Sequence, residues 1–335
     1  MLTIKRWLGA AIAAALFLPT FFLPAPVAAQ QEMLAFDSEF PLTISLDGTT
    51  PVQSFTFRCT KDRVASVYIE TVSGDLIAAA SVLDPNGSPF AQGIPVSSHP
   101  NITIAEAFII PANGDCELKL SRSGNTSGSA QLRLLSGYAH LARWDSFDKA
   151  ASPLRMKWTD FADLNMDVRI VHDQRLRLQI VYDNVLAYVT PDDPDFDLND
   201  LYIQADFSIE GTPTYFEYGF LIRSADDASS FYTVTFSSDG DYSIYYYDGD
   251  WNTVQDWTVS PLIDGTDHNP RVGVWVQGNT FRLYFGDRFV GEVVDTEHFA
   301  SQGTIGFAAA TTAHQTGILT VYADNAVITT PFQGQ

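Results

Sequence analysis

Basic residues are few for a chain of this length. The 335 residues include 19 Lys and Arg against 40 Asp and Glu, a formal net charge of −21 at pH 7. Residues 1–29 carry Lys5 and Arg6 but no acid, so the rest of the chain is more acidic still. Such a surface repels phosphate backbones and anionic lipid headgroups, which argues against nucleic acid as a partner.

Cysteine is almost absent. Cys59 and Cys116 are the only two, and both lie in the N-terminal half. In an exported chain such a pair most simply forms one disulfide, with two buried free thiols as the alternative. A catalytic cysteine is not indicated, because neither His99 nor His140, the histidines of the same half, has a recognisable partner motif.

Long apolar runs are missing after the first 29 residues. The stretch from about Trp7 to Leu23 follows Lys5 and Arg6 and leads to Val27-Ala28-Ala29, a pattern typical of a secretory signal peptide. A retained N-terminal anchor is the alternative. We therefore expect a secreted or cell-envelope protein without stable membrane insertion once the signal is removed.

Familiar catalytic and metal-binding motifs are also missing. The sequence has no Gly-x-Ser-x-Gly elbow, no His-Glu-x-x-His helix and no phosphate-cradling loop. Its six histidines are scattered singly, so the sequence does not support a histidine metal centre.

What the chain has in abundance is short aromatic and β-branched runs separated by turn residues. From Tyr218 to Val293 these runs are cut by Asp-Gly and Gly-Asn turns, as in antiparallel hairpins. The pattern predicts an all-β chain without helices between the strands. In the C-terminal half the predicted strands are Leu176 to Tyr182, Leu201 to Glu210, Tyr215 to Ser224, Phe231 to Ser237, Asp241 to Asp248, Val272 to Gln277, Thr280 to Phe285, Arg288 to Val294, Thr304 to Ala310 and Gly317 to Ile328.

The composition changes near Tyr138. All tryptophans beyond Trp7 follow it, and both cysteines precede it. We expect a signal peptide at 1–29, an accessory β-sandwich at 36–137 and a second β-sandwich of the jelly-roll type at 138–332.

The first module contains a series of short motifs. These are Phe55 and Phe57, Val67 and Ile69, Leu83 to Gly87, Pro111 to Leu118, and Gly128 to Leu132. Their order resembles the bacterial pre-peptidase C-terminal domain, an accessory sandwich of secreted proteins. Cys116 stands where that family usually has an aromatic residue, so a bond to Cys59 would join a late strand to an early one.

The second module has its own set of marks. They are Gly219-Phe220 with Arg223, Tyr232 with Phe236, Asp239-Gly240 with Tyr242, Trp251 with Trp257, Asn269 with Val272 and Val274, Gly303 with Ile305-Gly306, and Asp324-Asn325 with Val327. They resemble the concanavalin A-like lectin and glucanase superfamily. The resemblance implies a two-sheet jelly roll that is common in carbohydrate-binding proteins.

Aromatic residues around the Asp248-Gly249-Asp250 turn are the candidate ligand-binding residues. Tyr245 and Tyr247 share one face of a strand, and Trp251 follows the turn. Flat rings of this kind stack on sugars, and Arg223 and Asn252 could add polar contacts. The alternative is that these rings fill the sandwich core.

Catalytic carboxylates are harder to find. Glucanases of the resembled superfamily carry a Glu-x-Asp-x-x-Glu arrangement, which this sequence lacks. Asp206 and Glu210 share a strand face, but Glu210 abuts a turn. No catalytic residue is assigned.

Three acidic residues form a candidate calcium site. Asp145 and Asp148 open the second module and Asp324 closes it, and the first and last strands of such sandwiches commonly lie side by side. Carboxylates brought together there would suit a hard cation. A structural role of Asp324 in a bulge is the alternative, and no cofactor is required by the predicted function.

Together these features predict a secreted, non-catalytic, lectin-like protein that binds polysaccharide or a surface glycan. One alternative is a glycoside hydrolase with an atypical carboxylate pair. The other is a structural or adhesive protein of the cell envelope.

Overall fold

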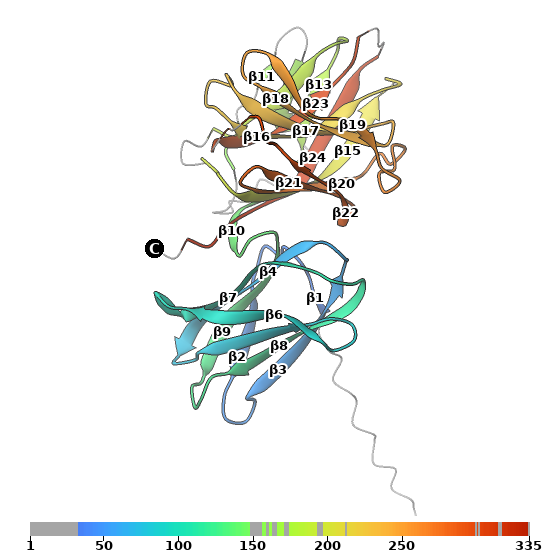
Figure 1. Cartoon of the computed structure of the whole chain (residues 1–335). Helices are drawn as coiled ribbons and strands as arrows, with labels where there is room; N and C mark the ends of the chain where they lie inside the picture. Colours follow the sequence, from blue (N-terminus) through green and yellow to red (C-terminus); the bar gives the residue numbers. More distant parts are fainter. Residues whose placement is uncertain are drawn as a thin grey trace, which may run out of the picture. The chain divides into compact units, whose positions relative to one another are not determined.

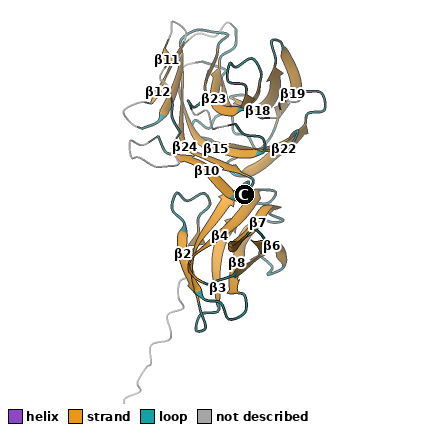
Figure 2. Ribbon diagram, turned by 90° about the vertical axis from the view of Figure 1, so that its left-hand side faces the viewer, coloured by secondary structure: helices purple, strands orange, loops and turns teal. Residues whose placement is uncertain are grey.

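The computed structural model describes residues 33–147, 156–158, 161–162, 166–170, 174–192, 197–211, 213–298, 300, 302–313 and 317–333. Within these ranges the chain consists of strands and their connections and has no helix, hence none that could span a membrane (Figures 1 and 2). The predicted signal peptide lies outside the described residues and stays a prediction.

The strands between Met33 and Ser136 form the first sandwich. In sheet order they are β1 (Met33–Leu34), β3 (Val52–Cys59), β8 (Gly114–Arg122), β5 (Ala78–Leu83), β6 (Pro89–Val96), β7 (His99–Ile109), β4 (Val64–Gly74), β9 (Gly128–Ser136) and β2 (Leu42–Leu46). Side chains along a strand point alternately into the core and away from it. Accordingly, Phe55, Phe57 and Cys59 of β3 are buried, while the residues between them are more exposed.

The predicted disulfide is confirmed. Cys59 and Cys116 are bonded, with their Cα atoms 5.8 Å apart, and both are buried in the core of the first sandwich. The bond joins β3 to its antiparallel neighbour β8. Among the described residues there is no free cysteine.

The remaining strands form the second sandwich, which has two sheets. The nine-stranded sheet has the order β11 (Phe161–Ala162), β12 (Met166–Ile170), β13 (Leu176–Ile180), β24 (Leu319–Thr330), β15 (Leu201–Gly211), β20 (Arg271–Gln277), β21 (Thr280–Phe285) and β22 (Arg288–Val294), and β10 (His140–Asp145) also pairs with β24. The six-stranded sheet has the order β14 (Leu186–Val189), β23 (Thr304–Ala310), β16 (Glu217–Ser224), β17 (Phe231–Ser237), β18 (Asp241–Tyr247) and β19 (Trp251–Val259).

One hydrophobic core lies between these two sheets. Phe207 of the nine-stranded sheet contacts Phe220 and Phe307 of the six-stranded sheet, with ring centroids 5.6 and 5.9 Å apart. This core and that of the first sandwich share no residue. The predicted fold class, all-β with two β-sandwiches of which the second is a jelly roll, is therefore confirmed.

All ten predicted strands of the C-terminal half are present, with their ends shifted by a few residues. β10, β11, β12, β14 and β19 were not predicted from the sequence. β19 shows why. It lies at the edge of its sheet, is rich in polar residues, and its register with β18 shifts twice around Ile244. An edge strand with an uncovered outer face and a shifted register shows no strict alternation of apolar and polar residues in the sequence.

Trp275 illustrates how the second sandwich is covered on one outer face. Its neighbours Val274 and Val276 enter the core, whereas Trp275 points outward from β20 and is still buried. The ring of Tyr138 stacks on it at 5.7 Å, and the Tyr138 hydroxyl donates a hydrogen bond to the Val276 carbonyl at 2.9 Å. Trp275 is therefore not available to a ligand.

The disulfide generates a stability prediction. Replacing both Cys59 and Cys116 by Ala should lower the free energy of unfolding of the first sandwich by about 2 to 4 kcal/mol, because the bond closes a long loop in the unfolded chain. Chemical denaturation monitored by circular dichroism measures this loss. Treating the wild type with a reductant should produce the same shift, and a loss below about 1 kcal/mol would contradict the prediction.

Candidate functional site

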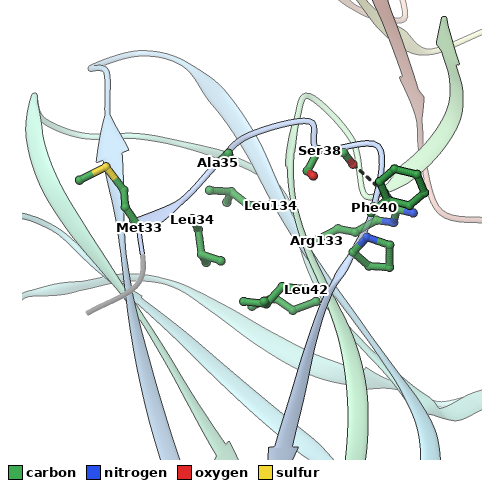
Figure 3. A pocket seen from close by; sticks show the side chains of 10 residues that line it. Met33, Leu34, Ala35, Ser38, Phe40, Leu42, Arg133 and Leu134 are labelled. Atoms are coloured by element: carbon green, nitrogen blue, oxygen red, sulfur yellow. Dashed lines mark hydrogen bonds between the residues drawn. The ribbon is translucent and has the colours of Figure 1, made fainter. Parts of the chain in front are cut away.

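The first sandwich contains a hollow beside β1 and β2 (Figure 3). It measures ≈ 260 Å³ and is lined mainly by apolar residues, among them Met33, Leu42 and Leu134. Arg133 is its one charged residue, and its guanidinium already donates to the carbonyl oxygens of Ser38 and Glu39 at 2.9 and 3.1 Å. This lining offers little to orient a polar ligand.

The outer face of the six-stranded sheet carries a different set of groups. On β18, Ile244 and Tyr246 point into the core, so Ser243, Tyr245 and Tyr247 point outward. β17 alternates in the same way and presents Phe231, Thr233, Thr235 and Ser237. The predicted pairing of Tyr245 with Tyr247 on one face, opposite Tyr246, is thus what the sheet shows.

Five rings gather at one end of this outer face. We call them the aromatic patch: Tyr188, Phe231, Tyr245, Tyr247 and Trp251. Tyr247 lies 5.2 Å from Phe231 and 5.1 Å from Trp251, centroid to centroid. Trp251 is 53% exposed, so about half of its side chain is accessible beside the rings that contact it.

Carboxyl groups occupy the other end of the outer face. Glu217 of β16 is in register with Ser237 of β17, and the Ser237 hydroxyl donates to Asp241 of β18. The Tyr245 hydroxyl donates to Asp256 of β19 at 3.3 Å. Tyr245 therefore connects the aromatic patch to this acidic end.

Glu217 has an unusual ionisation. Burial raises the pKa of its carboxyl to about 7, against an ordinary 4.5, and the charge of Asp241 adds to the rise. The hydrogen bond donated by the Tyr215 hydroxyl opposes part of the shift. Near neutral pH, Glu217 is thus a carboxyl that can carry or release a proton, beside a second acid.

The predicted binding residues fall into two groups. Tyr245, Tyr247 and Trp251 lie together in the aromatic patch. Arg223 and Asn252 are elsewhere, and whether a ligand contacts any of the five stays a prediction.

Arg223 is only 1% exposed. Its guanidinium donates to the carbonyl oxygens of Asn199 and Ala300 at 2.9 and 3.2 Å, and Asp200 lies 3.6 Å from it. The backbone of Arg223 has φ 53°, next to a register shift between β16 and β23. Because of this register shift, the Arg223 side chain does not point in the direction that regular strand alternation predicts.

Asn252 helps to shape the hairpin turn. Its side-chain amide donates to Asp248 Oδ1 at 3.0 Å and to the Asp250 carbonyl at 3.2 Å. It pairs with Tyr246, whose ring points to the core, so it does not share the face of Tyr245 and Tyr247.

The proposed calcium ligands do not come together as expected. Asp145 pairs with Ala326 on the core side, and its carboxylate accepts hydrogen bonds from Phe147 N, Met156 N and Trp158 Nε1 at 2.8, 3.2 and 3.1 Å. Asp324 is in register with Asp206 and lines a pocket on the outer face. Asp148 lies outside the described residues.

Metal binding accordingly stays a prediction. Across the part of the chain that the structure describes, no group of three or more His, Cys, Asp or Glu side chains could hold a metal ion. A calcium site at Asp324 would need ligands other than Asp145.

Sequence reasoning missed Glu217, Tyr215 and Phe231. The sequence contains only a weak indication of Glu217. It is the one acidic residue between Phe216 and Ile222, and strand alternation puts it on the face opposite to Tyr218 and Phe220. Alternation along a strand determines the face on which a residue lies. Its partners on neighbouring strands depend on the strand registers, which the sequence does not show.

Comparisons with known proteins give fold relatives only. No protein-family model matches the chain, and no curated protein matches it. Similar solved structures include carbohydrate-binding module CBM66 from Bacillus subtilis, with 17% identity and a TM-score of 0.41 over 52% of this chain and 97% of that one. Another is a Bacillus licheniformis β-glucanase, with 11% identity and a TM-score of 0.39 over 55% and 95%. A third is the Caenorhabditis elegans galectin LEC-6, with 9% identity and a TM-score of 0.30 over 45% and 96%.

At these identities the likeness concerns the fold and assigns no ligand or activity to this chain. The resemblance of the first module to the pre-peptidase C-terminal domain gains no support from a family model and stays a prediction.

The ionisation of Glu217 predicts a pH dependence of stability. Because its pKa is higher in the folded chain than in the unfolded one, folding favours the protonated form. The titration of Glu217 should therefore make the free energy of unfolding fall as pH rises from about 4.5 to 7. Glu217→Gln should remove that part of the fall and should be more stable than wild type at pH 8.

Thermal unfolding of both proteins between pH 4.5 and 8 tests this expectation. Glu210→Gln, which neutralises an exposed carboxyl at the end of β15, serves as the control and should keep the wild-type profile. Parallel curves for wild type and Glu217→Gln would show that Glu217 does not titrate in this range.

Proposed function

We propose that this protein is an exported glycan-binding protein and that the aromatic patch of its second sandwich holds the sugar chain. The observation that carries the proposal is the half-exposed indole of Trp251, which contacts Tyr247 and Phe231. Pyranose rings present apolar C–H faces that stack on such indole and phenol rings.

The polar part of the same face supports this proposal. Tyr245 of the aromatic patch contacts Asp256, and Asp241 lies at the acidic end of the same face. These residues offer hydroxyl and carboxylate oxygens as hydrogen-bond partners for sugar hydroxyls. A ligand that needs both flat apolar surface and many hydrogen bonds is a carbohydrate. The strongly negative net charge favours a neutral glycan over an acidic one.

Export is supported by the disulfide. Cys59–Cys116 is a buried structural bond, and such bonds persist in oxidising compartments outside the cytosol. The expected signal peptide at 1–29 is consistent with this, and we place the protein outside the cell or in the cell envelope.

Glycoside hydrolysis is the second candidate, because a specific observation favours it. Glu217, with a pKa of about 7, can supply a proton at neutral pH, and Asp241 presents a carboxyl group on the same face. Such a combination is what a general acid and its partner carboxylate require. The sequence-derived pair fits less well, since Asp206 is bound by Arg271 through both carboxylate oxygens, at 2.5 and 2.9 Å.

Replacing the exposed indole tests the binding proposal. Trp251→Ala should weaken binding to any polysaccharide that the wild type retains about tenfold, since one ring-stacking contact contributes about 1.4 kcal/mol. The melting temperature should change by no more than about 2 °C, because an exposed side chain is removed. Tyr182→Ala, which removes a 55% exposed ring outside the aromatic patch, should bind like the wild type.

The measurement is affinity electrophoresis or pull-down over a panel of insoluble and soluble polysaccharides. Equal retention of wild type and Trp251→Ala would reject the aromatic patch as the binding surface. Absence of retention on the entire panel would favour the structural or adhesive role.

Hydrolysis is tested separately by assaying release of reducing ends from the same polysaccharides. The binding proposal expects no release above the background of a heat-denatured sample. Release that Glu217→Gln lowers at least 100-fold would make the protein a glycosidase and Glu217 its acid.

A further inference from the structure

A second pocket lies on the opposite side of the second sandwich. It opens on the outer face of the nine-stranded sheet and has a volume of ≈ 420 Å³, within the range of about 300 to 1,000 Å³ typical of small-molecule sites. We call it the bulge pocket. Its lining residues are Arg175, Asp206, Phe207, Ser208, Asn269, Tyr322, Asp324 and Asn325.

Irregular backbone in two adjacent strands creates the pocket. The register between β15 and β24 shifts between Gln204 and Asp206. On β24, Ala323 and Ala326 both enter the core although they are three residues apart, so Asp324 and Asn325 form a bulge between them. Asn325 adopts φ 49° there, a left-handed conformation that asparagine tolerates better than most residues.

The acidic wall of the pocket is held in a fixed position. Arg271, directly opposite Asp206 on β20, donates to both of its carboxylate oxygens. The Asn325 side-chain amide donates to Asp206 Oδ2 at 3.0 Å. Asp324 is in register with Asp206 on the other side. These contacts fix the Asp206 carboxylate before any ligand arrives, which lowers the entropic cost of binding.

The opposite wall is amphipathic. The Arg175 guanidinium lies 3.8 Å from the centroid of the Tyr322 ring. Tyr322 is in register with Ser208, so the ring and the hydroxyl face the same side of the sheet. This wall offers hydrogen-bond donors together with aromatic surface.

The mixture of groups selects the chemical class of the ligand. Carboxylates accept hydrogen bonds, the guanidinium donates them, and the amides of Asn269 and Asn325 do both. The cations Arg175 and Arg271 disfavour a metal ion, and the carboxylates Asp206 and Asp324 disfavour an anion. A lining of carboxylates, guanidinium and amides is poorly suited to a purely apolar ligand. A neutral polyhydroxylated molecule both donates and accepts hydrogen bonds, so it matches every kind of polar group in this lining.

We propose that the bulge pocket binds a single neutral sugar unit, as a second carbohydrate site on the face opposite the aromatic patch. This inference rests on the proposed function for the class of ligand, but it concerns different residues on a different sheet. The second sandwich would then bind an extended glycan on one side and a monosaccharide or chain end on the other.

Filling the pocket tests the proposal in the full-length protein. The probes are D-glucose, D-galactose, D-fructose and N-acetyl-D-glucosamine, followed by saturation-transfer NMR and isothermal titration calorimetry. Wild type should bind at least one of them. Ser208→Trp, which places an indole in the pocket, should weaken that binding at least tenfold.

Two further variants control for folding. Asn269 is exposed and its side chain lines the pocket, so Asn269→Ala should fold normally and also weaken binding. Glu210→Trp adds the same bulk on the same strand and face but outside the lining, and should bind like the wild type. Monosaccharide binding that survives both Ser208→Trp and Asn269→Ala, or no binding of any probe to wild type, would overturn the proposal.

Trp251→Ala separates this proposal from the function of the aromatic patch. It should lose polysaccharide retention and keep monosaccharide binding. Trp251→Ala could lose polysaccharide retention while the bulge-pocket variants are unaffected in every assay. That result would support the aromatic patch as a site and reject the bulge pocket. The reverse result would support the bulge pocket and reject the aromatic patch.

Discussion

Burial of the inward faces of two sheets against each other is the constraint on which the second sandwich depends. Phe207, Phe220 and Phe307 meet in the middle of this core with no exposed surface beyond 2%. Each strand that contributes to the core must turn its alternate residues outward. The outer faces are therefore consequences of the core, and those of their residues that stay exposed are available for contacts that folding itself does not require.

The two outer faces differ in what they offer. The six-stranded sheet presents the aromatic patch and, at its other end, the acidic groups around Glu217. The nine-stranded sheet presents charged and amide side chains around the bulge of β24. On β20, its outer face is covered where Tyr138 stacks on Trp275. Tyr188 and Trp251 of the aromatic patch are exposed, and exposed aromatic surface costs solubility and adds little to the core. The aromatic patch is for that reason the part of the sandwich most readily explained by a ligand.

Much of this arrangement could be predicted from the sequence, because strand alternation is a local property. The strands on both sides of the Asp239-Gly240 turn, the shared face of Tyr245 and Tyr247 and the single disulfide are all confirmed. The neighbourhood of the first and last strands is confirmed as well, since β10 pairs with β24. Nevertheless Asp145 and Asp324 do not lie together as expected, because Asp145 lies on the core side and Asp324 forms part of the bulge that lines the pocket on the outer face.

What the sequence could not reveal depends on register shifts and on coverage by distant segments. Arg223 follows a regular strand pattern, yet a shift between Leu221 and Ser224 directs it to the carbonyl groups of Asn199 and Ala300. Glu217 acquires its raised pKa from burial and from the charge of Asp241 on β18. Neither effect leaves a local trace, because both depend on which strands pair and with which offset.

The proposed glycan site is the outer face of the six-stranded sheet and not another aromatic surface. The indole N–H signals of the tryptophans beyond residue 29, followed in a nitrogen-15 NMR spectrum during titration with a retained oligosaccharide, test it directly. The account predicts shifts for Trp251, and smaller ones for Trp257 near Tyr215, with those of Trp158 and Trp275 unchanged. Unchanged Trp251 and shifted Trp275 or Trp158 signals would contradict it.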